Sequence, residues 1–173
     1  MPLKTFLIVD GYNIIHAWPE LEDLTAVSLE SARVKLMDIL SNYQGMTDET
    51  VIVVFDGYLV KGSEGSVSEY NNIFVVYTKE AETADHYIEK TVTNIPKEYR
   101  VKVATNDGLE QTIIMGKGAI RITARELKLL IEQEEKYIRQ NYTEKRPAKN
   151  NMLMDNVDEE TLKWLEMMRR KKE

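Results

Sequence analysis

The sequence contains no cysteine and only two histidines, His16 and His86. The absence of cysteine excludes disulfide bonds, thiolate zinc sites and cysteine nucleophiles, and it suits a reducing cytosol. Two histidines are too few for a histidine-rich metal site. Any bound metal would therefore be held by carboxylates, which favours Mg²⁺ or Mn²⁺ over zinc.

Long apolar runs are also absent. The N-terminal run is short and is interrupted by Asp10, so it predicts neither a signal peptide nor a membrane span, and no later stretch is long enough to cross a bilayer. We therefore expect a cytoplasmic protein without a membrane partner. The net charge of −6 argues against non-specific binding to nucleic acid, because phosphate neutralisation needs Lys and Arg.

Short apolar runs alternate with segments of helical periodicity. The runs predict strands buried on both faces, as in parallel sheets, at residues 5–9, 51–55, 73–77, 101–104 and 119–122. Helices are predicted at 28–44, 83–94, 124–142 and 159–170, with a short one ending at 115. The Gly- and Ser-rich segment 57–71 is predicted to be a loop. This alternation indicates an α/β fold with a mainly parallel sheet.

The chain is expected to form one domain with an appendage. We place the domain at residues 1–145 and assign 146–173 to a C-terminal basic segment followed by an amphipathic helix. The apolar side of that helix, formed by Trp164, Leu165 and Met168, favours packing on the same domain. The sequence does not predict an oligomeric state.

Aspartates end or follow three of the predicted strands, at Asp10, Asp56 and Asp107. The carboxyl ends of parallel strands meet at one edge of the sheet, where open α/β sheets bind ligands. A fourth aspartate, Asp85, lies near the same edge, in the first turn of the helix after the third strand. Four converging carboxylates repel one another unless a cation lies between them. The pattern therefore predicts a divalent metal site, of a kind that activates water to hydrolyse a phosphodiester.

Each of these acids also has a purely structural interpretation. An Asp-Gly pair after a strand is common in turns, and Asp85 and Asp107 lie in segments that resemble ordinary helix caps. Their recurrence at strand ends favours the metal site. Glu80 and Glu82 are expected to be solvated or outer-shell groups rather than ligands.

Several linked motifs resemble those of one protein family. They are Asp10-Gly11-Tyr12-Asn13-Ile14-Ile15, Val53-Val54-Phe55-Asp56-Gly57, Tyr77-Thr78-Lys79-Glu80-Ala81-Glu82-Thr83-Ala84-Asp85 and Ala104-Thr105-Asn106-Asp107. In this order, over residues 3 to 170, they resemble the NYN branch of PIN-like nucleases and, more narrowly, the YacP-type proteins of Gram-positive bacteria and plastids.

The resemblance implies a PIN-like three-layer sandwich, with a mainly parallel central sheet flanked by helices, plus a C-terminal helix. It also implies endonucleolytic RNA cleavage with Mg²⁺ or Mn²⁺ held by Asp10, Asp56, Asp85 and Asp107 as catalytic residues. Asn13 matches the motif as well, where its amide is expected to orient a metal-bound water or touch a phosphate; a helix or turn cap is an equally good interpretation. YacP-type enzymes cleave mRNA at the ribosome, which makes the ribosome an expected partner.

An RNA substrate needs positive side chains near the acids. We expect RNA contacts from Lys61, Lys79, Lys117, Arg121 and Arg125, and stacking on an unpaired base from Tyr12. Each of these residues also has an interpretation as an ordinary surface or core residue. Because these basic residues are few, the protein is expected to bind free RNA weakly. We therefore predict poor cleavage of free RNA and strong enhancement by ribosomes.

Three other functions are known for folds of this kind or are compatible with parts of the sequence. A phosphoacceptor receiver domain needs an acidic pair after the first strand, and Asp10 is followed by glycine, which excludes that class. A flap-type DNA nuclease needs more acids and a helical arch, neither of which is visible. A non-catalytic ribosome- or RNA-associated binding protein with the same fold is compatible with the sequence, although the intact set of acids argues against it.

Overall fold

The computed structural model describes residues 4–57, 64–141 and 151–171, the last segment with side chains from residue 159 onward. Six strands within these segments form one sheet in the order β3-β4-β2-β1-β5-β6. The strands are β1 Thr5–Asp10, β2 Thr50–Phe55, β3 Ser66–Tyr70, β4 Ile73–Tyr77, β5 Arg100–Ala104 and β6 Ile120–Ile122. β3 runs antiparallel to β4, and the other pairings are parallel. The mainly parallel sheet predicted from the sequence is confirmed.

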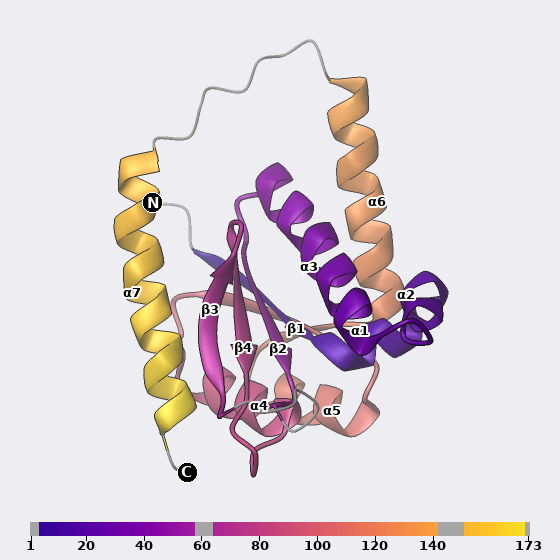
Figure 1. Cartoon of the computed structure of the whole chain (residues 1–173). Coiled ribbons are helices and arrows are strands. Elements are labelled where there is room, and N and C mark those ends of the chain that lie inside the picture. The colour runs from indigo at the N-terminus through magenta and orange to yellow at the C-terminus, as the bar shows by residue number, and fades with distance from the viewer. Residues whose placement is uncertain (1–3, 58–63, 142–150, 172–173) are drawn as a thin grey trace.

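Helices cover both faces of this sheet, and Figure 1 shows α6 and α7 on opposite sides of the molecule. One face packs against α1 (Gly11–Ala17), α2 (Pro19–Leu24), α3 (Leu29–Met46) and α6 (Ala124–Gln140). The other face packs against α4 (Ala84–Asn94), α5 (Gly108–Gly116) and α7 (Asn151–Arg170). The predicted three-layer α/β sandwich with a C-terminal helix is therefore confirmed.

The alternation of side chains along β1 determines which face each one meets. Leu7 and Val9 lie in the core that includes α3, whereas Phe6 and Ile8 lie in the core that includes α4. Asp10 ends the strand two residues after Ile8, so its side chain lies on the same face of the sheet as Phe6 and Ile8. It therefore points to the face that α4 and α5 cover.

The loop predicted over 57–71 is wrong in its second half, where the chain forms β3. β3 turns into β4 through Asn71 and Asn72, and the φ of 53° at Asn71 is left-handed, which asparagine adopts more readily than most residues. β3 is an edge strand whose residues are exposed or half-buried, so it lacks the continuous apolar run by which the other strands were found. Residues 11–24, which the sequence left unassigned, form the short helices α1 and α2.

The C-terminal helix α7 packs on β3 and α4 and begins earlier than residue 159, where the sequence predicted its start. Leu165 and Met168 are buried in the core shared with α4, and the Tyr87 hydroxyl donates a hydrogen bond of 2.9 Å to the Leu165 carbonyl. The predicted boundary between 145 and 146 lies outside the described residues. Among the residues that the structure describes, no helix is long and apolar enough to cross a membrane.

Candidate metal centre

The Asp-Gly pairs at the ends of β1 and β2 are not simple turns. Gly11 opens α1 directly after Asp10, and a Cβ atom added to it would lie 2.3 Å from Cε1 of Phe55. A Cβ atom at Gly57 would lie 1.8 Å from the carbonyl oxygen of Thr78. Close packing therefore requires glycine at both positions.

Three carboxylates from different elements meet at the carboxyl edge of the sheet. Asp10 comes from β1, Asp85 from the first turn of α4, and Glu110 from the first turn of α5. One oxygen of each lies within 4.8 Å of the others. Asp10 and Glu110 are each only 5% exposed, whereas Asp85 is exposed. We call these three residues the acid cluster; it is buried at its base and open to solvent beside Asp85.

A buried threonine hydroxyl lies between the two buried members of the acid cluster. Oγ1 of Thr105 is 3.0 Å from Oε2 of Glu110 and 3.3 Å from Oδ2 of Asp10, and it accepts a hydrogen bond from the Asp107 backbone N–H. One hydroxyl proton can serve only one of the two carboxylates at a time. Oε1 of Glu110 is buried and has no hydrogen-bond partner. The fold thus leaves acceptor capacity in the acid cluster unused.

Burial and mutual repulsion disfavour the charged forms of the acid cluster. Burial is the largest cause that raises the pKa of Asp10, and the negative charges of Asp85 and Asp56 raise it further. Burial also raises the pKa of Glu110 well above its ordinary value, and the charge of Asp10 adds to this rise. Without a cation, these carboxyl groups therefore hold protons far more tightly than exposed ones.

The acid cluster has the donor set of a hard divalent cation site. All three side chains offer carboxylate oxygens, which Mg²⁺, Mn²⁺ and Ca²⁺ prefer. No lysine or arginine among the described residues forms an ion pair with any of them. Oε1 of Glu110, which has no hydrogen-bond partner, leaves this carboxylate with unused acceptor capacity. The residues present therefore fit a metal ion.

Two predicted ligands lie beside the acid cluster and are already engaged with helix ends. Oδ1 of Asp56 accepts a hydrogen bond of 2.8 Å from the backbone N–H of Ala84, at the start of α4. Oδ1 of Asp107 accepts from the backbone N–H groups of Leu109 and Glu110 and caps α5. Both lie outside the group of three within 4.8 Å. A role for either as a metal ligand stays a prediction.

Asn13 ties α1 to the loop that carries Thr105 and Asp107. Its Oδ1 accepts a hydrogen bond of 2.7 Å from the Asn106 backbone N–H. Oδ1 of Asn106 in turn accepts from the backbone N–H of Ala124, the first residue of α6. The carbonyl oxygen of the Asn13 amide is therefore used to hold this loop in place.

Glu110 is the cluster member that the sequence reasoning missed. Asp85 was found because it lies in the first turn of a helix that starts at the acidic edge of the sheet. Glu110 lies in the equivalent turn of α5, three residues after Asp107. The same argument applied to the second helix would have identified it.

The residues predicted to contact RNA are dispersed in the structure. Arg121 on β6 and Arg125 at the start of α6 are exposed, and Lys79 is half-buried in the segment before α4. Lys117 precedes β6 and therefore lies toward the opposite edge of the sheet from the acids, because β6 is parallel to β5. Lys61 lies outside the described residues.

Tyr12 occupies the core. It is 5% exposed, its ring packs 5.0 Å from that of Phe55 between centroids, and its hydroxyl accepts a hydrogen bond from Nη1 of Arg33. No ring face is open for stacking on a base. Burial therefore argues against the RNA contact predicted for Tyr12, which stays an untested prediction.

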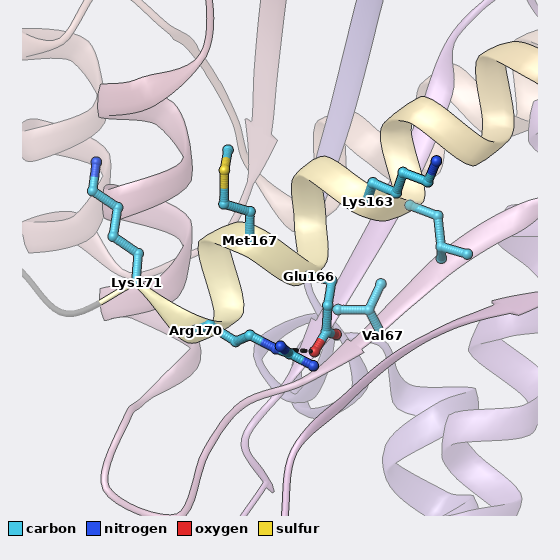
Figure 2. A pocket seen from close by; sticks show the side chains of 7 residues that line it. Val67, Lys163, Glu166, Met167, Arg170 and Lys171 are labelled. Carbon is cyan, nitrogen blue, oxygen red and sulfur yellow. Dashed lines mark hydrogen bonds and ion pairs between the residues drawn. The ribbon is translucent and has the colours of Figure 1, made fainter.

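A separate groove of about 830 Å³ runs along α7 and β3 (Figure 2). Val67, Leu162 and Met167 line it together with charged side chains. Nε of Arg170 lies 3.0 Å from Oε1 of Glu166, a pair marked by the dashed line in Figure 2. None of its lining residues belongs to the acid cluster. With Lys163, Arg170 and Lys171 against the single acid Glu166, the groove is a partly apolar surface with an excess of positive charge.

Comparison with known proteins assigns the family. A model described as the YacP-like NYN domain matches residues 7–170 of the sequence. The chain belongs to the YacP-like NYN family. NYN domains are PIN-like nuclease domains, and in this member the acid cluster is the arrangement consistent with a metal site.

This YacP-like chain is similar to proteins from Bacillus subtilis. It is 44% identical over 164 residues to the uncharacterized protein YacP of strain 168, which covers 91% of this chain and 95% of that protein. The crystal structure of Rae1 (YacP) from B. subtilis has a TM-score of 0.68 at 42% identity, covering 98% of this chain and 95% of that one. A mutant of Rae1 gives the same TM-score over 79% of this chain and 80% of that one. The match spans nearly the whole length of both proteins.

Proposed function

We propose that this YacP-like protein is a divalent-metal-dependent endoribonuclease that hydrolyses RNA phosphodiester bonds. The acid cluster supports this most directly: Asp10, Asp85 and Glu110 present oxygens within 4.8 Å of one another in a domain of a nuclease family. Two of these carboxylates are buried and form no ion pair with the lysines and arginines that the structure describes. Their charged forms are costly to folding unless a cation binds between them.

Each side chain has a proposed role. Asp10, Asp85 and Glu110 would hold Mg²⁺ or Mn²⁺, which when bound activates water and stabilises the leaving oxygen of a phosphodiester. Asp56 and Asp107 belong to the proposed catalytic set as neighbouring carboxylates. The Thr105 hydroxyl orients Glu110, and Asn13 holds the loop behind it.

We further propose mRNA on the ribosome as the physiological substrate. Support comes from the net charge of −6 and from the dispersed positions of the predicted basic contacts. A protein with few bases near its site grips free RNA weakly. We expect cleavage of a labelled mRNA by the purified protein to be slow and to rise strongly when translating ribosomes are added. Rapid and unselective digestion of free RNA would contradict this substrate.

The hydrolytic proposal is tested with variants of the acid cluster. Asp10→Asn and Glu110→Gln keep side-chain size and remove one negative charge each, so we expect each to lower the cleavage rate at least ~100-fold, since even outer-shell changes at metal sites cost this order. The matched control is Asp23→Asn, an exposed aspartate on α2. Rates are measured with Mn²⁺ on a labelled RNA and on a DNA of equal sequence, and activity should be confined to RNA.

Asp107→Asn in the same assay separates capping from ligation. Asparagine is also a good N-cap residue, so a rate close to wild type means that Asp107 only caps α5. If Asp10→Asn and Glu110→Gln leave the cleavage rate unchanged, the protein is not a metal-dependent nuclease. The alternative, a non-catalytic RNA- or ribosome-associated protein with this fold, would then be favoured.

A further inference from the structure

A groove between α4 and α5 opens directly beside the acid cluster. Its volume is about 220 Å³. Two members of the acid cluster, Asp85 and Glu110, line it. Glu110 is 5% exposed, and its Oε1 is buried without a hydrogen-bond partner. The groove is therefore continuous with the site at which a phosphodiester would be cleaved.

One wall of the groove is an apolar ledge on α5. Leu109 and Ile113 lie four residues apart on this helix and so share one face, and Ile114 closes the floor. Leu109 is 73% exposed, although a leucine gains free energy when covered. Leu109 thus offers an uncovered apolar surface to a ligand in the groove.

The opposite wall, on α4, carries carboxylates. Glu89 lies four residues after Asp85 on the same face of the helix and also lines the groove. Its Oε1 forms an ion pair with Nζ of Lys117 at 4.0 Å, which is too long for a hydrogen bond, and the side chain is 41% exposed, so the carboxylate can still accept hydrogen bonds. A flat group that is apolar on its faces and carries N–H donors on its edge matches both walls.

We infer that this groove binds a nucleobase next to the scissile phosphate of single-stranded RNA, and that Glu89 favours bases with an exocyclic amino group. The inference rests on the proposed nuclease function, which places a phosphate at the acid cluster. In a single strand, the base adjoining that phosphate is free to enter a neighbouring groove, whereas a duplex keeps it stacked. Leu109 and Ile113 cover the face of the base, and Glu89 accepts from its amino group, as acidic side chains do from cytosine N4.

Binding of short RNAs that differ only in their bases tests this inference. Fluorescence anisotropy is measured for wild-type protein with oligo(C), oligo(U) and an abasic strand of equal length and charge, in the presence of Mn²⁺ and before cleavage proceeds. Cytosine and uracil differ at one amino group, so we expect oligo(C) to bind about tenfold more tightly than oligo(U), as for a hydrogen bond to a charged group. The abasic strand should bind most weakly.

Two variants locate the effect, with one matched control. Leu109→Ser should weaken oligo(C) and oligo(U) alike by about fivefold and leave the abasic strand unchanged. Glu89→Leu should remove the preference for cytosine. The control Leu129→Ser alters another exposed leucine, on α6 rather than α5, and should change nothing.

The outcomes separate this inference from the proposed function. Equal binding of base-bearing and abasic strands, or no effect of Leu109→Ser, overturns the base site even if RNA is cleaved. A preference for oligo(C) that survives Glu89→Leu overturns the role of Glu89. Base-dependent binding that Leu109→Ser abolishes, without any hydrolysis of the same strands, upholds the groove and overturns the nuclease proposal.

Discussion

Two groups of buried or half-buried charged side chains lie near α4, and they are neutralised differently. In the first, Nζ of Lys90 lies 2.7 Å from Oε2 of Glu82, donates to the carbonyl oxygen of Lys171 and lies 5.5 Å from the centroid of the Tyr87 ring. In the second, Asp10 and Glu110 share a threonine hydroxyl and have no ion-pair partner among the described lysines and arginines.

The difference between them indicates what each group is for. A buried ion pair costs desolvation and stays in the fold when its opposite charges balance each other internally. The Lys90–Glu82 pair meets this condition, although Oε1 of Glu82 is buried without a hydrogen-bond partner, and it joins the end of α7 to the segment that leads into α4. The acid cluster does not meet it, so its neutralising charge has to come from outside the chain. The predictions below test this contrast.

The largest expected effect concerns the pair that is neutral within the fold. Lys90→Met leaves the Glu82 carboxylate buried beside an apolar side chain, and we expect the free energy of unfolding to fall by about 3–5 kcal/mol. Urea denaturation measures this change. The double variant Lys90→Met with Glu82→Leu removes both charges and should recover most of the loss. A single variant as stable as the wild type would show that the pair is not what balances Glu82.

The next effect is the stabilisation of the folded protein by a cation that binds the acid cluster. Mn²⁺ at 100 times its dissociation constant should stabilise the wild-type protein by about 2.7 kcal/mol, because it binds the folded chain alone. Thermal melting in Mn²⁺ and in EDTA measures this difference. Asp10→Asn should lose it, whereas the control Asp23→Asn should keep it. Equal stabilisation of wild type and Asp10→Asn would place the metal elsewhere.

The smallest effect is the pH dependence of stability without metal. The pKa values of Asp10 and Glu110 are raised in the fold, so these groups bind protons more tightly when folded. Their contribution favours folding below the ordinary carboxyl pKa and is lost as the pH rises through the raised values. In EDTA, the wild-type melting temperature should therefore fall from pH 5 to pH 8 relative to Asp10→Asn, by about 2–4 °C for each kcal/mol. If the melting temperatures of the two proteins change with pH in parallel, burial and repulsion do not raise the pKa values of Asp10 and Glu110.

The parts of the fold that could be predicted are those with a strong local signal. The continuous apolar runs of β1, β2 and β4 are buried in the structure as expected. β3 was missed because an edge strand with half-exposed residues lacks such a run. The short helices α1 and α2 escaped for a similar reason, since six or seven residues are too few to show a clear helical period.

The site residues that could be predicted are likewise those with a local signal in the sequence. Asp10 and Asp85 were found because each stands at the end of a strand or the start of a helix at the acidic edge. The structure brings Glu110 to them, while Asp107 caps the helix that carries it. Sequence spacing alone did not separate these two acids, since both lie at the start of α5.

That acidic residues gather at one edge of a mainly parallel sheet follows from local properties of the chain, namely the apolar runs of the strands and the aspartates that end them. Which oxygens meet, that Tyr12 is buried and that Lys117 lies toward the far edge became visible in the folded protein alone. The direction of a side chain depends on strand order and on how each helix packs across the sheet. Those contacts join residues as distant in sequence as Asp10 and Glu110, and no local pattern records them.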